Sequence, residues 1–237
     1  MSDRPDRLIT LVEELSPAAV NPVLVHSFSG FMDAGSAAQI AVNHLLDTCP
    51  ERIVAQWDSD ELIDYRARRP KMVFDSDRFV SAELPRITLR EVLDDRGTPF
   101  LLLSGPEPDY RWREFLESVS WVVNSFNVDL SVGLIGIPWP APHTRPIGIT
   151  WHGTDHRLFE GHSSTLGMLE IPGHMQAMLE YHLGQRGNDA MGLAVHVPHY
   201  LTQFEYPRAA ISLLRGLAVA TGLELPTDGL EDQAREA

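Results

Sequence analysis

The 237-residue chain has very little lysine, very little cysteine and no long apolar run. Lys71 is the sole lysine among nineteen basic residues, so chemistry that needs a lysine amine has one candidate. Cys49 is the sole cysteine, which excludes an internal disulfide and favours a reducing compartment. The longest apolar runs, such as residues 100–103, are far shorter than the roughly 20 residues that span a bilayer, and the N-terminal residues do not resemble a signal peptide. We therefore expect a cytoplasmic protein with no membrane partner.

Positive charge is also scarce. The chain has 19 basic and 33 acidic side chains, which gives a net charge of -14. Because such a chain repels a phosphate backbone, nucleic acid is not an expected partner. The sequence also lacks the glycine-rich G-x-x-x-x-G-K-[ST] and G-x-G-x-x-G loops that hold the phosphates of nucleotides. We expect no cofactor.

Segments with strand and helix patterns alternate along most of the chain. Strands are expected at residues 23–28, 52–57, 87–89, 100–103, 130–137, 147–151 and 190–197, and helices at residues 33–46, 112–126, 173–185 and 208–220. The turn signal Asp-Asp-Arg-Gly at residues 94–97 separates two apolar runs and predicts a β-hairpin. This order predicts a single α/β domain over residues 1–237, a three-layer α/β/α sandwich with a mixed central sheet.

Two segments fall outside this alternation. Residues 58–85 are charged and poorly periodic, so we expect them to form an extended excursion on the surface. Residues 226–237 are polar and acidic, so we expect a disordered tail that contributes nothing to the fold.

The turn at residues 26–38, His-Ser-Phe-Ser-Gly-Phe-Met-Asp-Ala-Gly-Ser-Ala-Ala, joins an expected strand to an expected helix. It does not match the G-x-S-x-G nucleophile elbow, because Gly30 follows Ser29 directly. In one interpretation, N–H groups at the start of the helix hold an anion beside Ser29, Gly30 and Asp33. In the other, which we favour, Gly30 turns the chain and the Asp33 carboxylate caps the helix, in the place that an anion would occupy.

Residues 142–146, Pro-His-Thr-Arg-Pro, form the most unusual polar cluster. They follow an expected buried strand, and a proline on each side stiffens them. His143, Thr144 and Arg145 are candidates for binding a carboxylate or phosphate, and His199, at the end of another strand, is a further candidate. Equally, Arg145 could pair with one of the many acids and hold the loop in place.

Two further groups of polar residues have weaker patterns. The histidines within residues 152–162 and 196–199 do not have the spacing of a known metal motif, so we expect no metal site. Glu107 and Asp109 follow another strand, where a binding site and a helix cap explain them equally well.

Several segments together resemble the proteasome assembly chaperone 2 family in its bacterial form. They are spread over residues 23–222, and several are long and unusual in composition. The matching segments are Ser29-Gly-Phe-Met-Asp-Ala-Gly35, Asp60-Glu-Leu-Ile-Asp-Tyr-Arg66 with Arg69-Pro70, Gly97-Thr-Pro-Phe-Leu-Leu-Leu103 with Gly105-Pro-Glu-Pro-Asp109, Pro142-His-Thr-Arg-Pro146, and His196-Val-Pro-His-Tyr200 with Glu205-Tyr-Pro207.

The resemblance implies a fold similar to purine nucleoside phosphorylases and peptidyl-tRNA hydrolases, homo-oligomers, and a role like that of eukaryotic relatives that help to assemble proteasome rings. We therefore expect a protein-interaction or assembly-chaperone-like protein without catalytic residues, with the proteasome as the candidate partner. The alternative is a small-molecule hydrolase or phosphorylase that acts on a nucleoside-like or anionic ligand. A deep pocket in which Asp33 and Arg145 converge would favour that alternative, and a flat apolar face would favour partner binding.

The sequence and the resemblance together favour a homotrimer. Relatives form rings or small oligomers, and this chain carries large aromatic side chains in segments that do not resemble core. These residues are Trp139, Trp151, Tyr200, Phe204 and Tyr206. Aromatic side chains are enriched in protein interfaces, so as a group they predict contacts between chains.

Overall fold

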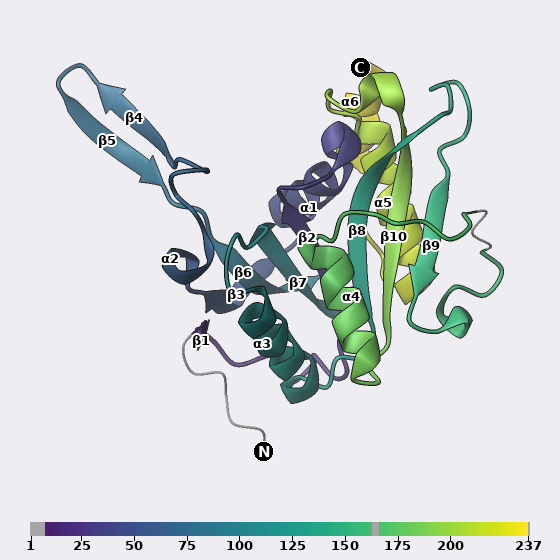
Figure 1. Cartoon of the computed structure of the whole chain (residues 1–237), viewed down its shortest axis with the longest axis horizontal. Helices are drawn as coiled ribbons and strands as arrows, with labels where there is room; N and C mark the ends of the chain where they lie inside the picture. Colours follow the sequence, from purple (N-terminus) through teal and green to yellow (C-terminus); the bar gives the residue numbers. More distant parts are fainter. Residues whose placement is uncertain (1–7, 163–165, 237) are drawn as a thin grey trace.

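The computed structural model describes residues 8–162 and 166–236. Eight strands form one sheet in the order β1-β3-β6-β7-β2-β8-β10-β9 (Figure 1). Their bounds are β1 Ile9–Leu11, β2 Leu24–Ser29, β3 Glu51–Trp57, β6 Ile87–Leu93, β7 Pro99–Pro106, β8 Ser131–Trp139, β9 Ile149–Gly153 and β10 Ala190–Pro198. Strands β7, β2, β8 and β10 run parallel to one another, and the outer strands pair antiparallel. The sheet is therefore mixed, as predicted.

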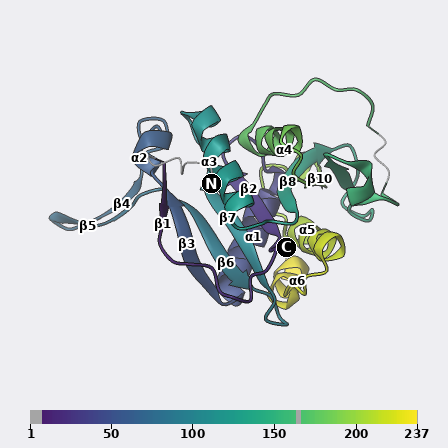
Figure 2. The ribbon, with the colours of Figure 1, turned by 90° about the horizontal axis from the view of Figure 1, so that it is seen from below.

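Helices cover both faces of this sheet. Helices α3 (Trp112–Ser125) and α4 (Met175–Gln185) lie on one face. Helices α1 (Ala37–Thr48), α5 (Pro207–Thr221) and α6 (Asp228–Glu236) lie on the other, as the view in Figure 2 shows. The predicted α/β/α sandwich is confirmed. Within the described residues, no helix combines the length and the apolar character needed to cross a membrane.

The central strands are apolar throughout because both of their faces are covered. Successive residues of a strand point to opposite faces. In β2, Leu24 packs in the cluster beneath α3 and α4, and the next residue, Val25, packs in the cluster beneath α1 and α5. In β7, Leu101 and Leu102 divide between the same two clusters. A continuous apolar run is therefore the expected signature of these strands.

The predicted hairpin at residues 94–97 joins β6 to β7. The Asp94 side chain organises its turn, because Oδ1 accepts hydrogen bonds from Arg96 N–H at 2.9 Å and from Thr98 N–H at 2.7 Å. Gly97 has a φ of 79°, a left-handed conformation that glycine adopts without strain. The turn residues and the strand pairing both agree with the prediction, so this hairpin could be predicted from the sequence alone.

Most of residues 58–85 lie on the surface as expected, but Leu62 and Ile63 are buried in the core and the segment has structure of its own. The short helix α2 (Ser59–Leu62) begins it, and β4 (Lys71–Asp75) pairs antiparallel with β5 (Arg78–Glu83). We call this hairpin the β4–β5 arm. It projects away from the body of the molecule (Figure 1), and each of its strand residues is exposed.

The structure corrects the expectation of a disordered tail. Residues 228–236 form α6, which packs against α5. Leu230 is only 2% exposed, and Arg215 forms an ion pair with Glu231 at 2.7 Å. The carbonyl of Pro226 also lies 3.1 Å from His44 Nε2 on α1. The segment is part of the fold up to residue 236, and Ala237 lies outside the described residues.

Candidate functional site

The candidate residues lie at one edge of the sheet, where the parallel strands end. Ser29 and Gly30 close β2, residues 143–145 follow β8, and His199 follows β10. Because parallel strands bring their carboxyl ends to the same edge, segments far apart in sequence meet there. Their contacts divide these residues into two groups.

Asp33 forms the centre of the first group, and its carboxylate bonds to backbone rather than to a ligand. Oδ1 accepts hydrogen bonds from Ala38 N–H at 2.9 Å and Gly136 N–H at 3.0 Å, and Oδ2 accepts one from Gln39 N–H at 2.9 Å. Burial raises the pKa of Asp33, and these three backbone donors oppose that rise. The carboxylate thus occupies the N-terminus of α1, which supports the capping interpretation.

Ser29 and Gly30 meet Glu107, which is almost fully buried at the end of β7. Glu107 N–H donates to the Ser29 carbonyl at 2.7 Å. Glu107 Oε1 accepts from Met175 N–H, the first residue of α4, at 2.6 Å. A Cβ at position 30 would lie 3.0 Å from Glu107 Cβ, so glycine makes room for this carboxylate. Glu107 therefore anchors α4, a role that sequence did not reveal because 68 residues separate the partners.

Arg68 belongs to the same group and was missed from sequence. It donates through Nη1 to the Glu107 carbonyl at 2.6 Å and pairs through Nη2 with Asp109 at 2.8 Å. Asp109 Oδ2 also accepts from Asp64 N–H at 2.8 Å. Two segments on which the family resemblance rests, 60–66 and 105–109, are thereby tied together at the base of the β4–β5 arm. These contacts hold the arm to the body and engage the Asp109 carboxylate on both of its oxygens.

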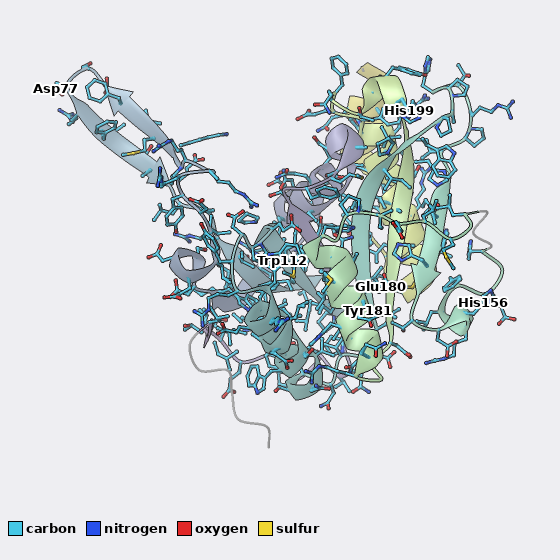
Figure 3. The ribbon with its side chains drawn as sticks, viewed as in Figure 1. Asp77, Trp112, His156, Glu180, Tyr181 and His199 are labelled. Carbon is cyan, nitrogen blue, oxygen red and sulfur yellow. The ribbon has the colours of Figure 1, made fainter. Side chains whose placement is uncertain are left out.

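The second group surrounds the loop after β8. His143 N–H donates to the Tyr200 hydroxyl at 2.8 Å, and the same hydroxyl lies 2.8 Å from His143 Nδ1. Arg145 N–H donates to the Pro142 carbonyl at 3.1 Å, which closes the turn. Tyr200 follows His199 in the turn beyond β10, so the two candidate segments are in contact. Figure 3 labels His199 at this end of the molecule.

His143, Thr144 and Arg145 line an open cavity of about 750 Å³ against α5 and α6. We call it the arginine cavity, because Arg145, Arg208, Arg215 and Arg235 all line it. Arg215 pairs with Glu231 and Arg235 pairs with Asp232. Within the described part of the chain, Arg145 and Arg208 form no ion pair with an acid. This is a local excess of positive charge on a strongly acidic protein.

The two groups do not converge. Ser29 and Asp33 line a separate cavity of about 220 Å³, whereas His143 and Arg145 line the arginine cavity and a neighbouring one of about 410 Å³. The Asp33 oxygens are already engaged by backbone donors. The convergence of Asp33 and Arg145 that would favour a hydrolase or phosphorylase is therefore not found.

The remaining histidine candidates bond to neighbouring side chains. His152 Nδ1 lies 3.0 Å from the Glu180 carboxylate, and His196 Nε2 lies 2.8 Å from Thr150 Oγ1. His162 stacks on Trp151 with ring centroids 4.0 Å apart. Among the residues that the structure describes, no three His, Cys, Asp or Glu side chains are placed to share a metal ion.

A mixed sheet between two helical layers, with the candidate residues at the ends of its parallel strands, defines an α/β sandwich protein. The chain belongs to the PAC2 family, whose model matches residues 27–237. A search among curated proteins found no match.

Solved structures of similar proteins cover almost the whole chain. A Mycobacterium tuberculosis protein of unknown function, Rv2714, is 39% identical with a TM-score of 0.92, over 98% of this chain and 82% of that one. A Corynebacterium glutamicum protein of unknown function is 37% identical with a TM-score of 0.91, over 98% of this chain and 87% of that one. The Mycobacterium tuberculosis proteasome-assembly chaperone homologue Rv2125 is 27% identical with a TM-score of 0.81, over 90% and 91%.

Proposed function

We propose that this chain is a homo-oligomeric, assembly-chaperone-like protein of the cytoplasm that acts by binding other protein chains and performs no catalysis. Family membership and the likeness to a proteasome-assembly chaperone homologue support this proposal. The alternative, a small-molecule hydrolase or phosphorylase, loses its motivation because Asp33 and Arg145 line different cavities.

The observation that carries the proposal is the exposure of apolar side chains on the β4–β5 arm. Met72, Phe74 and Phe79 are 54%, 57% and 64% exposed. Phe74 and Phe79 pack edge to face across the hairpin, with ring centroids 5.1 Å apart. An isolated two-stranded hairpin is marginally stable in water, and exposed apolar clusters mark binding surfaces. We infer that copies of the chain bury the arm against one another, in a trimer.

The arginine cavity supplies a second surface of different chemistry. Arg145 and Arg208, beside His143 and Thr144, suit carboxylates on an incoming protein segment because guanidinium groups bind carboxylates in pairs of hydrogen bonds. Tyr200, which bonds to His143 at this cavity, is 55% exposed and can pack on the apolar part of such a segment. We propose that an acidic segment of a partner, with proteasome subunits as the candidates, binds here.

Sedimentation velocity with purified proteasome subunits from the same organism tests this function. The fluorescently labelled chain should sediment with the subunits, and Arg145→Ser should weaken that association about tenfold or more, as expected when a charged hydrogen bond is lost. Arg113→Ser is the matched control, because Arg113 is an exposed arginine on α3, outside the cavity. Sedimentation of the labelled chain at its own rate at every subunit concentration would reject proteasome subunits as partners.

A further inference from the structure

One large cavity of the described residues plays no part in the proposed protein contacts. It has a volume of about 900 Å³ and lies between α4 and the strands β8, β9 and β10, beneath residues 166–172. We call it the α4 cavity. Glu180 and Tyr181, which Figure 3 labels on α4, line one wall. Pockets of 300–1,000 Å³ typically hold small organic molecules, so its size suits such a ligand.

Small residues in the floor of the cavity create this space. Gly192 and Ala194 lie on β10, and Ala177 lies on α4. A Cβ at position 192 would clash with the imidazole of His152 and would lie 2.5 Å from its Nε2. Glycine at this position therefore allows the His152 ring to lie across β10 and reach the Glu180 carboxylate at 3.0 Å.

The polar residues that line the cavity include one close pair, His152 and Glu180. The side chains of His152 and Glu180 are 44% and 18% exposed, so the pair is partly open to the space. The hydrogen bond uses His152 Nδ1, and the carboxylate retains lone pairs for a further donor. Gln176, on α4 one turn before Glu180, is almost fully buried and lines the same wall.

The charge of the lining discriminates between ligand classes. Among the described residues that line it, none is an arginine or lysine, and Glu180 is the sole acid. An anion would therefore lie beside the Glu180 carboxylate without an arginine or lysine to pair with, which is costly. A cation would meet the carboxylate of Glu180, and the lining also holds the aromatic rings of Phe31 and Trp139, each stacked on a histidine.

We propose that the α4 cavity binds a small apolar amine, a molecule with a hydrophobic ring system whose ammonium group donates to Glu180. The ring system fills the space between α4 and the apolar side chains of Ile135, Ile137 and Leu169. This preference is the opposite of that of the arginine cavity, so the two sites take different ligands. The inference does not depend on the proposed chaperone function.

Three matched probes test this preference by isothermal titration calorimetry on the full chain. They are 1-naphthylmethylamine, 1-naphthalenemethanol and 1-naphthoate, which share a ring system and differ in the charge of the head group. The amine should bind most tightly, and the carboxylate should bind about tenfold more weakly or worse, a difference that corresponds to about 1.4 kcal/mol. Equal binding of the amine and the carboxylate overturns the proposal, and so does failure of all three to bind at about 1 mM.

Two variants then locate the bound probe. Glu180→Gln keeps the shape of the side chain and removes its charge. It should therefore weaken binding of the amine about tenfold and leave binding of the alcohol nearly unchanged. Ala194→Leu should weaken both by filling the floor. Glu205→Gln is the matched control, since Glu205 is exposed and lies away from the cavity. Unchanged amine binding in Glu180→Gln overturns the proposal even if Ala194→Leu fails to fold.

A second copy of the chain is the competing occupant, because Leu169 and Ile171 at the rim are 61% and 65% exposed. Calorimetry on the wild type and on the double variant Phe74→Ser with Phe79→Ser, which should not assemble, separates the two. The same affinity in both proteins supports the small-molecule site. Binding that appears only in the double variant shows that a neighbouring chain fills the cavity, and it overturns the proposal.

Discussion

The carboxylate of Asp33 accepts a hydrogen bond from the backbone N–H of Gly136, 103 residues away, at 3.0 Å. The same oxygen accepts from Ala38 N–H, so one side chain joins the start of α1 to the central strand β8. A Cβ at position 136 would clash with the Ala34 carbonyl and lie 3.0 Å from Asp33 Oδ1. The contact thus depends on glycine in the strand as much as on the acid in the turn.

Replacing Asp33 by alanine should destabilise the protein by about 2 kcal/mol or more, because three backbone N–H groups lose their acceptor and two of them start a helix. Chemical denaturation measures the free energy of unfolding. Asp47→Ala, at an exposed position of the same helix, is the control and should change it by less than about 0.5 kcal/mol. Equal effects of the two substitutions would show that the Asp33 contacts contribute nothing to stability.

His26 should make the fold sensitive to mild acid. It is fully buried beneath α4 and neither of its ring nitrogens has a partner among the described residues. Burial, with a smaller contribution from His174, lowers the pKa of His26 from 6.5 to about 3. Between these values the unfolded chain binds a proton that the folded chain does not. The contribution of neutral, buried His26 to the free energy of unfolding is therefore complete above pH 6.5. It is lost progressively as the pH falls toward 3.

The variant His26→Leu removes this dependence. Between pH 7.5 and pH 5, His26→Leu should lose about 2 kcal/mol less unfolding free energy than the wild type. This difference is the cost of the one proton that the unfolded wild-type chain binds and the folded chain does not. Its stability at pH 7.5 should be nearly unchanged, since no hydrogen bond of the ring is lost. The control is His199→Leu, because His199 is exposed. Parallel pH profiles of the wild type and His26→Leu would contradict the prediction.

Leu230 should be the residue through which α6 stabilises the fold. It is 2% exposed and packs in the cluster beneath α1 and α5. Leu230→Ala should cost about 2–3 kcal/mol, the usual range for a buried leucine, and thermal unfolding followed by circular dichroism measures the effect. Gln233→Ala, on the exposed side of α6, serves as control. If truncation after Pro226 leaves the melting temperature unchanged, α6 does not contribute and the original expectation of an inert tail is restored.

The sandwich could be predicted because its signals are local. Runs such as residues 100–103 are apolar on both sides of the strand, and the Asp94 turn carries its own hydrogen bonds. Helix α6 could not be predicted, because Leu230 and Ala234 are the few apolar residues in a segment that is otherwise polar. Its stability comes from the packing of these few apolar side chains on α5. That contact is visible only in the three-dimensional structure.

The candidate residues lie at the ends of strands, but the sequence did not reveal the side chains that they contact. Arg68 and Glu107 are 39 residues apart, and Glu107 and Met175 are 68 apart, so no short motif reveals that they bond. The arginine cavity has the same origin, because Arg145 meets Arg208 only after α5 folds back onto the sheet. Sequence patterns identify which residues end strands, whereas contacts between distant segments require the fold.

Static light scattering behind a sizing column measures how many chains form the particle, from high to low micromolar protein. An obligate interface resists dilution, so the wild type should keep the mass of three 26.5 kDa chains throughout. The double variant Phe74→Ser with Phe79→Ser should dissociate, because it removes both rings of the β4–β5 arm. Val219→Ser, at a position of α5 that is 69% exposed, should leave the mass unchanged. A mass of two or four chains would keep the oligomer and reject the trimer, and a constant wild-type mass of 26.5 kDa would contradict the proposed homo-oligomer.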